Sequence, residues 1–201
     1  MIETIRPLLA VPQAYQFFWN VIGGPGRSKI LVQEYIRPRT GDRILEIGCG
    51  PGTIVPYLPD SEYVGFDASP AYVAKARKRF PQAKFSCQRV SQYTPPQSDY
   101  FDIVLALGIL HHLDDAEASH LFQIAHHALH SGGKLVTLDG VWEKGQSVVS
   151  RYLLARDRGR FIREEEEYAE LALQFFRDVK PSIRHDLLRI PYTHIILECV
   201  R

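Results

Sequence analysis

Cysteine and long apolar runs are both scarce in this chain of 201 residues. The three cysteines, Cys49, Cys87 and Cys199, form an odd and sparse set, which predicts a reducing compartment and no disulfide framework. No apolar run reaches the roughly 18 residues of a transmembrane helix, so we expect no membrane span. The N-terminus also lacks a basic region followed by an apolar stretch, which argues against a signal peptide and for a cytoplasmic protein.

Basic and acidic residues are almost equal in number. The chain has 24 Lys and Arg against 23 Asp and Glu, a net charge of +1, so its overall field attracts neither nucleic acid nor anionic membranes. We therefore expect a small molecule as the partner and no nucleic acid. Whether the chain is a monomer or a homodimer is left open by these numbers. The length and the 45% share of hydrophobic residues fit one domain with a sizeable core.

Apolar runs alternate with amphipathic segments through the middle of the chain. Strands are expected at 43–47, 62–66, 84–88, 101–106 and 134–139, and helices at 53–58, 70–80 and 115–130. This alternation predicts a parallel sheet with helices on both faces. After a helix at 164–179, two more strands, 183–190 and 192–199, are joined at Pro191. They must pair antiparallel, because a parallel crossover needs about a dozen residues or more.

The first 40 residues are expected to be helical and rich in aromatic side chains, among them Tyr15, Phe18 and Trp19. A break is expected at 23–26, followed by a short helix at 28–35. Two interpretations stay open for the aromatic segment. It is either a lid over a binding site, with π faces toward a cation, or a helix packed on the sheet.

The stretch from residue 43 to residue 53 carries the most information. A strand with Glu46 near its end leads directly into a turn that contains Gly48, Gly50 and Gly52. Without Cβ atoms, such a turn brings its backbone N–H groups close to a ligand. A carboxylate beside the turn would oppose a pyrophosphate and favour a ligand that carries an ammonium or a sulfonium.

Asp67 ends the next strand, about 20 residues beyond the glycine turn. An acidic side chain in this position accepts hydrogen bonds from a ribose diol in dinucleotide-binding folds. The alternative is that Asp67 caps the following helix. Ser69 followed by Pro70 already predicts that cap, since Ser suits the cap position and Pro the first helical position.

The pattern Glu-x-Gly-x-Gly-x-Gly after a strand, together with Asp67 and the antiparallel C-terminal hairpin, resembles the class I S-adenosylmethionine-dependent methyltransferases. Residues 107–113, where His111 and His112 follow a strand, are similar to the methyltransferase type 11/12 and ubiquinone-biosynthesis group. The resemblance implies a doubly wound α/β fold. Its mostly parallel seven-stranded sheet would have the order 3-2-1-4-5-7-6, with the last strand antiparallel and an N-terminal helical lid.

The resemblance also implies one domain over residues 1–201. Residues 1–40 would form the N-terminal helical segment, 41–140 the cofactor-binding core, and 141–201 the acceptor-side helices and hairpin. The implied reaction is the transfer of a methyl group from S-adenosylmethionine to O, N or C of a small molecule by in-line displacement. No metal is implied.

The residues implied to hold S-adenosylmethionine follow the family's motifs. They are Glu46, Gly48, Cys49, Gly50, Gly52, Asp67, Ala68, Val90, Ser91, Leu107 and Gly108. The family often has an acid after the third strand, where this chain has Arg89 and Ser91, so the adenine contact there is a departure from the pattern.

His111 and His112 are the candidate catalytic residues, because imidazole titrates near neutrality and can take a proton from an acceptor. The alternative is that they only pack in the turn. Trp19, Arg156 and Arg158 are the candidate acceptor-binding residues, the arginines for an anionic group. For the arginines, the alternative is a solvated helix with salt bridges to the acidic run at 164–167.

Two other functions compete with catalysis of methyl transfer. One is a non-catalytic S-adenosylmethionine-binding partner subunit. The other is an NAD-dependent reductase or epimerase, although the nearest match to the Tyr-x-x-x-Lys pair of such enzymes, Tyr72 to Lys75, is one residue short. His126 and His130 have helical i, i+4 spacing without the metalloprotease glutamate, which favours a solvated face over a metal site.

Overall fold

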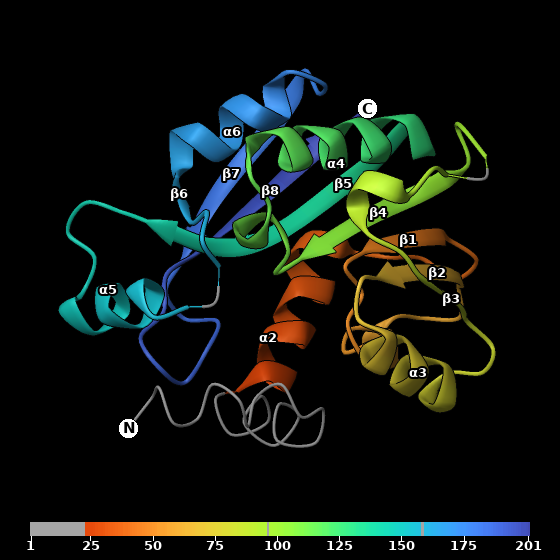
Figure 1. Cartoon of the computed structure of the whole chain (residues 1–201), viewed down its shortest axis with the longest axis horizontal. Coiled ribbons are helices and arrows are strands. Elements are labelled where there is room, and N and C mark those ends of the chain that lie inside the picture. The colour runs from red at the N-terminus through yellow and green to blue at the C-terminus, as the bar shows by residue number, and fades with distance from the viewer. Residues whose placement is uncertain (1–22, 96, 158) are drawn as a thin grey trace.

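The computed structural model describes residues 23–95, 97–157 and 159–201, shown in Figure 1. Eight strands are present in this part of the chain. They are β1 (Arg43–Ile47), β2 (Glu62–Asp67), β3 (Lys84–Cys87), β4 (Phe101–Leu107), β5 (Leu129–Trp142), β6 (Arg163–Glu164), β7 (Asp178–Arg184) and β8 (His194–Val200). The α-helices are α2 (Gly24–Ile30), α3 (Pro70–Arg79), α4 (Asp115–Ala128), α5 (Val148–Ala155) and α6 (Glu165–Leu173).

The sheet has the strand order β3-β2-β1-β4-β5-β8-β7, and the two-residue β6 pairs with β5 outside this path. β1 to β5 run parallel, and β8 runs antiparallel to both of its neighbours. Without the short β6, this is the expected order 3-2-1-4-5-7-6 with the last strand antiparallel. The predicted fold class is therefore confirmed.

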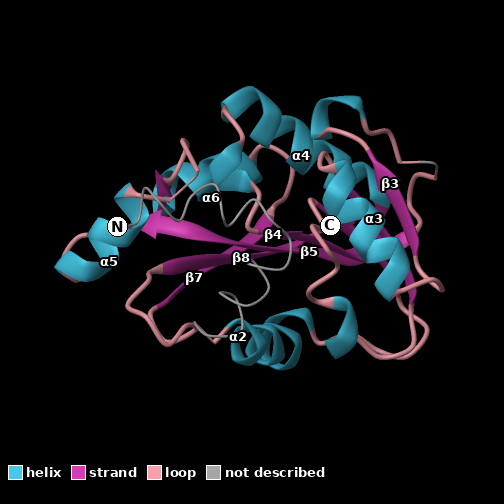
Figure 2. Cartoon of the chain, turned by 60° about the horizontal axis from the view of Figure 1, so that its bottom comes forward, coloured by secondary structure: helices cyan, strands magenta, loops and turns pink. Residues whose placement is uncertain are grey.

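Helices cover both faces of the sheet, with α4 and α6 on the side opposite α2 in Figure 2. The core beneath α4 and α6 contains Leu121, Phe122, Tyr168 and Phe176. The core on the other face, which α2 and α3 cover, contains Leu31, Ile36, Val73 and Ala76. Both clusters are almost completely buried, and full burial of one such side chain contributes about 1.5–3 kcal/mol.

The C-terminal hairpin is antiparallel as expected, but its first strand and its connection were predicted wrongly. The helix expected at 164–179 ends at Leu173, and β7 begins at Asp178 instead of residue 183. Residues 185–193 connect the strands, so no tight link exists at Pro191. Pro181 lies within β7, where a missing N–H is tolerated because β7 is the edge strand.

Two other helices also differ from the prediction. The helix expected at 53–58 is only a 3-10 turn, Val55–Tyr57, because Leu58 is extended before Pro59. α4 ends at Ala128, and the glycines expected to terminate it lie inside β5.

The helix expected at 28–35 begins earlier than predicted. The break expected at 23–26 is confined to Gly23, which has φ +97°, since α2 begins at Gly24 with Pro25 in its first turn and continues into a π-helix, Leu31–Ile36. Trp19 and the proposed lid lie outside the described residues and stay predictions. None of the described helices is long and apolar enough to cross a membrane. The compartment and the division into one domain also stay predictions.

Candidate functional site

The glycine turn follows the carboxyl end of β1 and folds back on β2. The N–H groups of Gly48 and Cys49 both donate to the Phe66 carbonyl at 2.9 Å. Gly48 has φ +73°, and a Cβ there would lie 2.5 Å from Ile109 Cδ1, so the turn after β4 packs on bare backbone. Gly50 has φ +52°, and an added Cβ would meet nothing within 4 Å. The turn therefore presents its backbone to open space at Gly50.

Asp67 joins the end of β2 to this turn. Its carboxylate accepts a hydrogen bond from the Gly50 N–H at 2.9 Å and another from the Ser69 N–H at 2.8 Å. Burial raises the pKa of Asp67, and these two hydrogen bonds oppose the rise. The cap of α3 is Ser69, whose hydroxyl accepts from the Tyr72 N–H at 3.4 Å, as the sequence predicted.

Glu46 lies on β1 beside the turn and is only 2% exposed. Its carboxyl accepts a hydrogen bond from the Tyr63 hydroxyl. Burial raises the pKa of Glu46 to about 8, although the Tyr63 hydrogen bond opposes the rise. This raised pKa favours the neutral form of the Glu46 carboxyl. A cation bound nearby would favour its ionised form.

The other predicted cofactor residues lie along the same edge of the sheet. Ala68 and Ser91 are exposed, and Val90 is buried. Leu107 pairs with Leu138 of β5, and Gly108, with φ +80°, donates its N–H to the Leu138 carbonyl at 2.7 Å. The parallel sheet thus places the ends of β1 to β4 side by side, as such folds do at their ligand sites.

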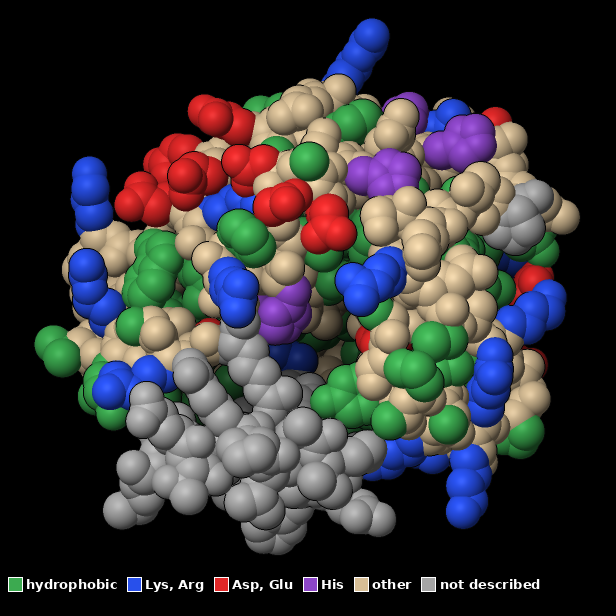
Figure 3. Space-filling view, viewed as in Figure 1, with side chains coloured by type: hydrophobic (Ala, Val, Ile, Leu, Met, Phe, Trp, Pro, Cys, Tyr) green, Lys and Arg blue, Asp and Glu red, His purple; other side chains and the backbone are tan. Residues whose placement is uncertain are grey.

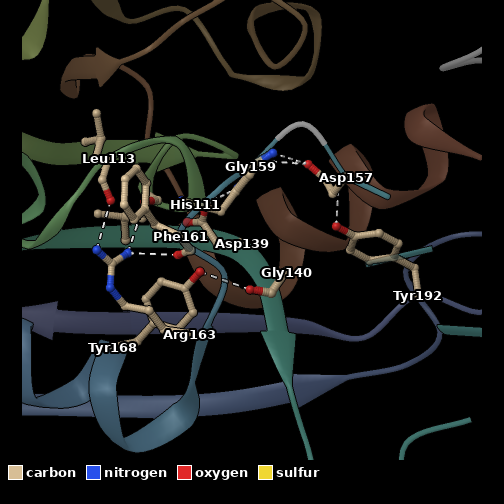
Figure 4. Close-up of polar contacts among 11 residues, drawn as sticks. His111, Leu113, Asp139, Gly140, Asp157, Gly159, Phe161, Arg163, Tyr168 and Tyr192 are labelled. Carbon is tan, nitrogen blue, oxygen red and sulfur yellow. Dashed lines mark hydrogen bonds and ion pairs between the residues drawn. The ribbon is translucent and has the colours of Figure 1, made fainter. Parts of the chain in front are cut away.

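His111 is the centre of a second polar cluster, shown in Figure 4. Its Nδ1 lies 2.6 Å from Asp139 Oδ1, and its backbone N–H donates to the same oxygen at 3.2 Å. Its Nε2 lies 3.4 Å from Asp157 Oδ1. Burial lowers the pKa of His111, but the hydrogen bond to Asp139 and the charges of both carboxylates outweigh burial and leave this pKa raised.

The two candidate histidines differ in their surroundings. His111 is buried, whereas His112 is exposed and its ring centroid lies 4.1 Å from that of His111. The Asp139 carboxylate orients the His111 ring. His111 therefore has the arrangement of a general base and its positioning residue.

The loop between α5 and β6 packs on His111. Asp157 accepts hydrogen bonds from the Tyr192 hydroxyl and the Gly159 N–H, both at 2.9 Å. The Phe161 N–H donates to the His111 carbonyl at 3.0 Å. A Cβ on Gly159 would lie 2.1 Å from His111 Cδ2, so only glycine fits this approach.

The arginine cluster separates into structural and exposed members. Arg163 is buried and donates to the carbonyls of Leu110, Phe161 and Leu113 and to the Asp115 carboxylate. It therefore holds the turn after β4 and does not pair with the acidic run. Arg156 is exposed, with its guanidinium 3.8 Å from the Tyr152 ring centroid. Arg158 lies outside the described residues.

Sequence reasoning missed several residues of this cluster. Asp139 follows an apolar run at the same edge as Asp67, so the same signal could have identified it. Asp157, Tyr192 and His194 lie in segments without a motif. Asp139 Oδ2 and His194 Nδ1 are buried atoms that have no hydrogen-bond partner among the described residues.

No group of three or more potential metal ligands occurs in the described ranges. His130 instead lies 2.9 Å from Asp102, through its Nε2 and Asp102 Oδ1. His126 packs edge-on against Phe176, with 5.4 Å between ring centroids.

Comparison with known proteins agrees with this geometry. Residues 45–135 match a family model described as a methyltransferase domain. An uncharacterized methyltransferase of Synechocystis sp. is 30% identical over 120 residues, covering 59% of this chain and 56% of that protein. A trans-aconitate 2-methyltransferase of Methylobacterium radiotolerans is 35% identical over 75 residues, which is 35% of this chain and 28% of the relative. The chain thus spans well under two thirds of either relative.

Solved structures show the same fold at low identity. Phosphoethanolamine N-methyltransferase 2 of Haemonchus contortus, in complex with phosphomonomethylethanolamine and S-adenosylhomocysteine, superposes with a TM-score of 0.77 at 16% identity. The match covers 98% of this chain and 59% of that one. A TehB-like methyltransferase of Corynebacterium glutamicum has a TM-score of 0.67 at 18% identity, with 94% of this chain and 97% of that chain covered.

Proposed function

Because the chain carries the methyltransferase domain of the class I S-adenosylmethionine-dependent family, we propose that it transfers a methyl group from S-adenosylmethionine to a small molecule. The observation that carries the proposal is the glycine turn at the end of β1. Open space adjoins Gly50, whose N–H donates to the Asp67 carboxylate, and buried Glu46 lies on the strand that leads into the turn. A positively charged nucleoside with two free ribose hydroxyls suits this combination.

The residues present fit S-adenosylmethionine. Open space adjoins Gly50, and the nearest atom to a Cβ added at Gly108 is His111 Cε1 at 3.9 Å. Asp67 would accept the ribose hydroxyls with the lone pairs that Gly50 and Ser69 leave available. Val90 and Ser91 would border the adenine, and Leu107 and Gly108 the sulfur side. When bound, the cofactor supplies a methyl group on a good leaving group.

His111 would act on the acceptor side as the general base, with Asp139 as the residue that positions it. The Nδ1–H donates to Asp139, which leaves Nε2 as the atom that can take a proton once His111 is neutral. Because the pKa of His111 is raised, its neutral form needs a higher pH than the neutral form of an ordinary histidine. His112, whose ring is exposed, is the weaker candidate.

The protein would contribute mainly by holding the acceptor in line and excluding water, an effect worth roughly 7–11 kcal/mol in well-oriented reactions. The Gly159 loop supports this role, since it covers the His111 ring. An anionic acceptor is supported by the match to trans-aconitate methyltransferases and by exposed Arg156 next to Asp157. Arg158 and Trp19 complete the proposed acceptor residues.

The experiment is to incubate the protein with S-adenosylmethionine and a panel of carboxylate, amine and hydroxyl acceptors and to measure S-adenosylhomocysteine. We expect turnover with at least one acceptor, a loss of about 100-fold or more in His111→Asn, and little change in the control His112→Asn. Binding of S-adenosylmethionine without turnover would favour the non-catalytic partner subunit. Failure to bind it would refute the proposed function.

A further inference from the structure

α5 exposes several large apolar side chains. Val148 is 84% exposed, Val149 52% and Tyr152 46%. The opposite side of the same helix is buried, with Leu154 at 1% exposure. Because Val148 and Tyr152 are four residues apart, they lie on one face of the helix. Large aliphatic groups at such exposure indicate a surface that meets something other than water.

The segment that contains α5 is rich in positive charge. Residues 144–161 contain five Lys and Arg and one acidic residue, a local charge of +4 in a chain whose net charge is +1. Arg151, Arg156 and Arg160 are exposed. The acidic residue, Asp157, turns toward Tyr192 and Gly159. In Figure 3, hydrophobic and basic side chains mix at the edge of the molecule where α5 lies, and acidic side chains gather just above that edge, where Figure 1 places α6.

We propose that α5 docks on the surface of an anionic membrane. Valine and tyrosine side chains enter the boundary between headgroups and acyl chains, and neighbouring arginines pair with lipid phosphates. A second copy of the chain fits less well, because a symmetric contact through this face would place its arginines opposite one another. The chain's small net charge is consistent with this proposal, since the attraction comes from the local patch.

The helix is held in place before any partner arrives. The Ser147 hydroxyl caps it by accepting from the Ser150 N–H at 3.1 Å. The Ser150 hydroxyl accepts the Thr193 N–H at 3.0 Å and lies 2.8 Å from the Thr193 hydroxyl. Gln146 donates to the Thr193 hydroxyl at 2.9 Å. This network fixes α5 to the start of β8, so docking orders no new structure.

Docking would place the candidate site at the bilayer surface. The chain leaves α5 at Ala155 and reaches Asp157 and Gly159, which contact His111. An acceptor held in the membrane, with its polar end at the surface, would then reach His111 from this side. Only this consequence rests on the proposed function, and the docking itself does not.

The test is co-sedimentation of the full chain with vesicles of phosphatidylcholine alone or of equimolar phosphatidylcholine and phosphatidylglycerol. We expect binding to the anionic vesicles only, weakened by salt. Val148→Asp combined with Val149→Asp should weaken it at least about tenfold, and Arg151→Gln about fivefold. The matched control is Leu173→Asp, which changes a 55% exposed leucine on α6 and should leave binding unchanged.

Three results would overturn the proposal. They are equal sedimentation with both vesicles or with neither, an equal loss of binding in Leu173→Asp, and a lower unfolding temperature or altered oligomeric state in the valine variant. The last result would mean that protein covers α5. S-adenosylmethionine binding by the same variants is measured in parallel. If the wild type sediments with anionic vesicles but ignores S-adenosylmethionine, the proposed function fails and docking stands.

Discussion

Replacing Glu46 by Gln should remove a pH-dependent loss of stability. The folded protein raises the pKa of Glu46 from 4.5 to about 8, with burial as the main cause. Between these two values the folded state holds a proton that the unfolded state releases. The stabilisation from this raised pKa is therefore complete in acid and is lost as the pH rises to about 8. Glu46→Gln is neutral throughout and keeps a partner for the Tyr63 hydroxyl.

The size of the effect follows from the shift. Each pH unit within the window costs about 1.4 kcal/mol, which gives at most about 5 kcal/mol across the range from 4.5 to about 8. Water that enters around the ionised carboxylate reduces this cost. Between acid and alkaline solution, the free energy of unfolding of Glu46→Gln should therefore rise by about 2–5 kcal/mol relative to that of the wild type.

The assay is urea unfolding of both proteins at several values between about pH 5 and pH 9, followed by circular dichroism. The difference between the two free energies of unfolding isolates Glu46, since all other titrating groups are common to both. Glu170→Gln, which changes an exposed carboxylate on α6, is the control and should give a nearly constant difference. A constant difference for Glu46→Gln as well would refute the neutral buried carboxyl.

Three further predictions concern the cluster around His111. Gly159→Ala should lower the free energy of unfolding, measured in urea, by about 1–3 kcal/mol, because the added Cβ overlaps the His111 imidazole. The control is Gly26→Ala, where the added Cβ lies in open space and should leave the stability unchanged or raise it. Asp139→Asn should lower the pKa of His111 in an NMR titration, and an unchanged pKa would show that the carboxylate is not its main support. Arg163→Ala should destabilise by about 2–4 kcal/mol in thermal unfolding by leaving buried carbonyls without donors, and a loss below about 0.5 kcal/mol would contradict this role.

Local patterns predicted the part of the fold that depends on neighbours in sequence. β1 has the predicted bounds, and Ser69 caps α3, because a buried strand and a capped helix are defined by a few adjacent residues. The strand order came from the resemblance to the methyltransferase family, and only the antiparallel pairing of the last two strands came from the sequence itself. The position of β7 could not be predicted, since the pairing of Asp178 with Val200 is a long-range contact that displaces a plausible helix end.

The candidate site also has a part that the sequence predicted and a part that it did not. The glycine turn and Asp67 form one motif and meet through the Gly50 hydrogen bond. Asp157 and Tyr192 are brought to His111 only by the folding of the chain after β5, and no spacing in the sequence marks them. The raised pKa of Glu46 also could not be predicted from the pattern, because it depends on burial rather than on residue type.

The most direct test of S-adenosylmethionine binding is a pair of calorimetric titrations, one with S-adenosylmethionine and one with NAD. We expect the wild type to bind S-adenosylmethionine and not NAD, and Asp67→Ala to bind it at least about tenfold more weakly, by loss of charged hydrogen bonds. Near neutral pH, binding should release a proton from Glu46, seen as heats that differ between phosphate and Tris buffers. Uptake of NAD without S-adenosylmethionine, or undiminished binding by Asp67→Ala, would contradict the account.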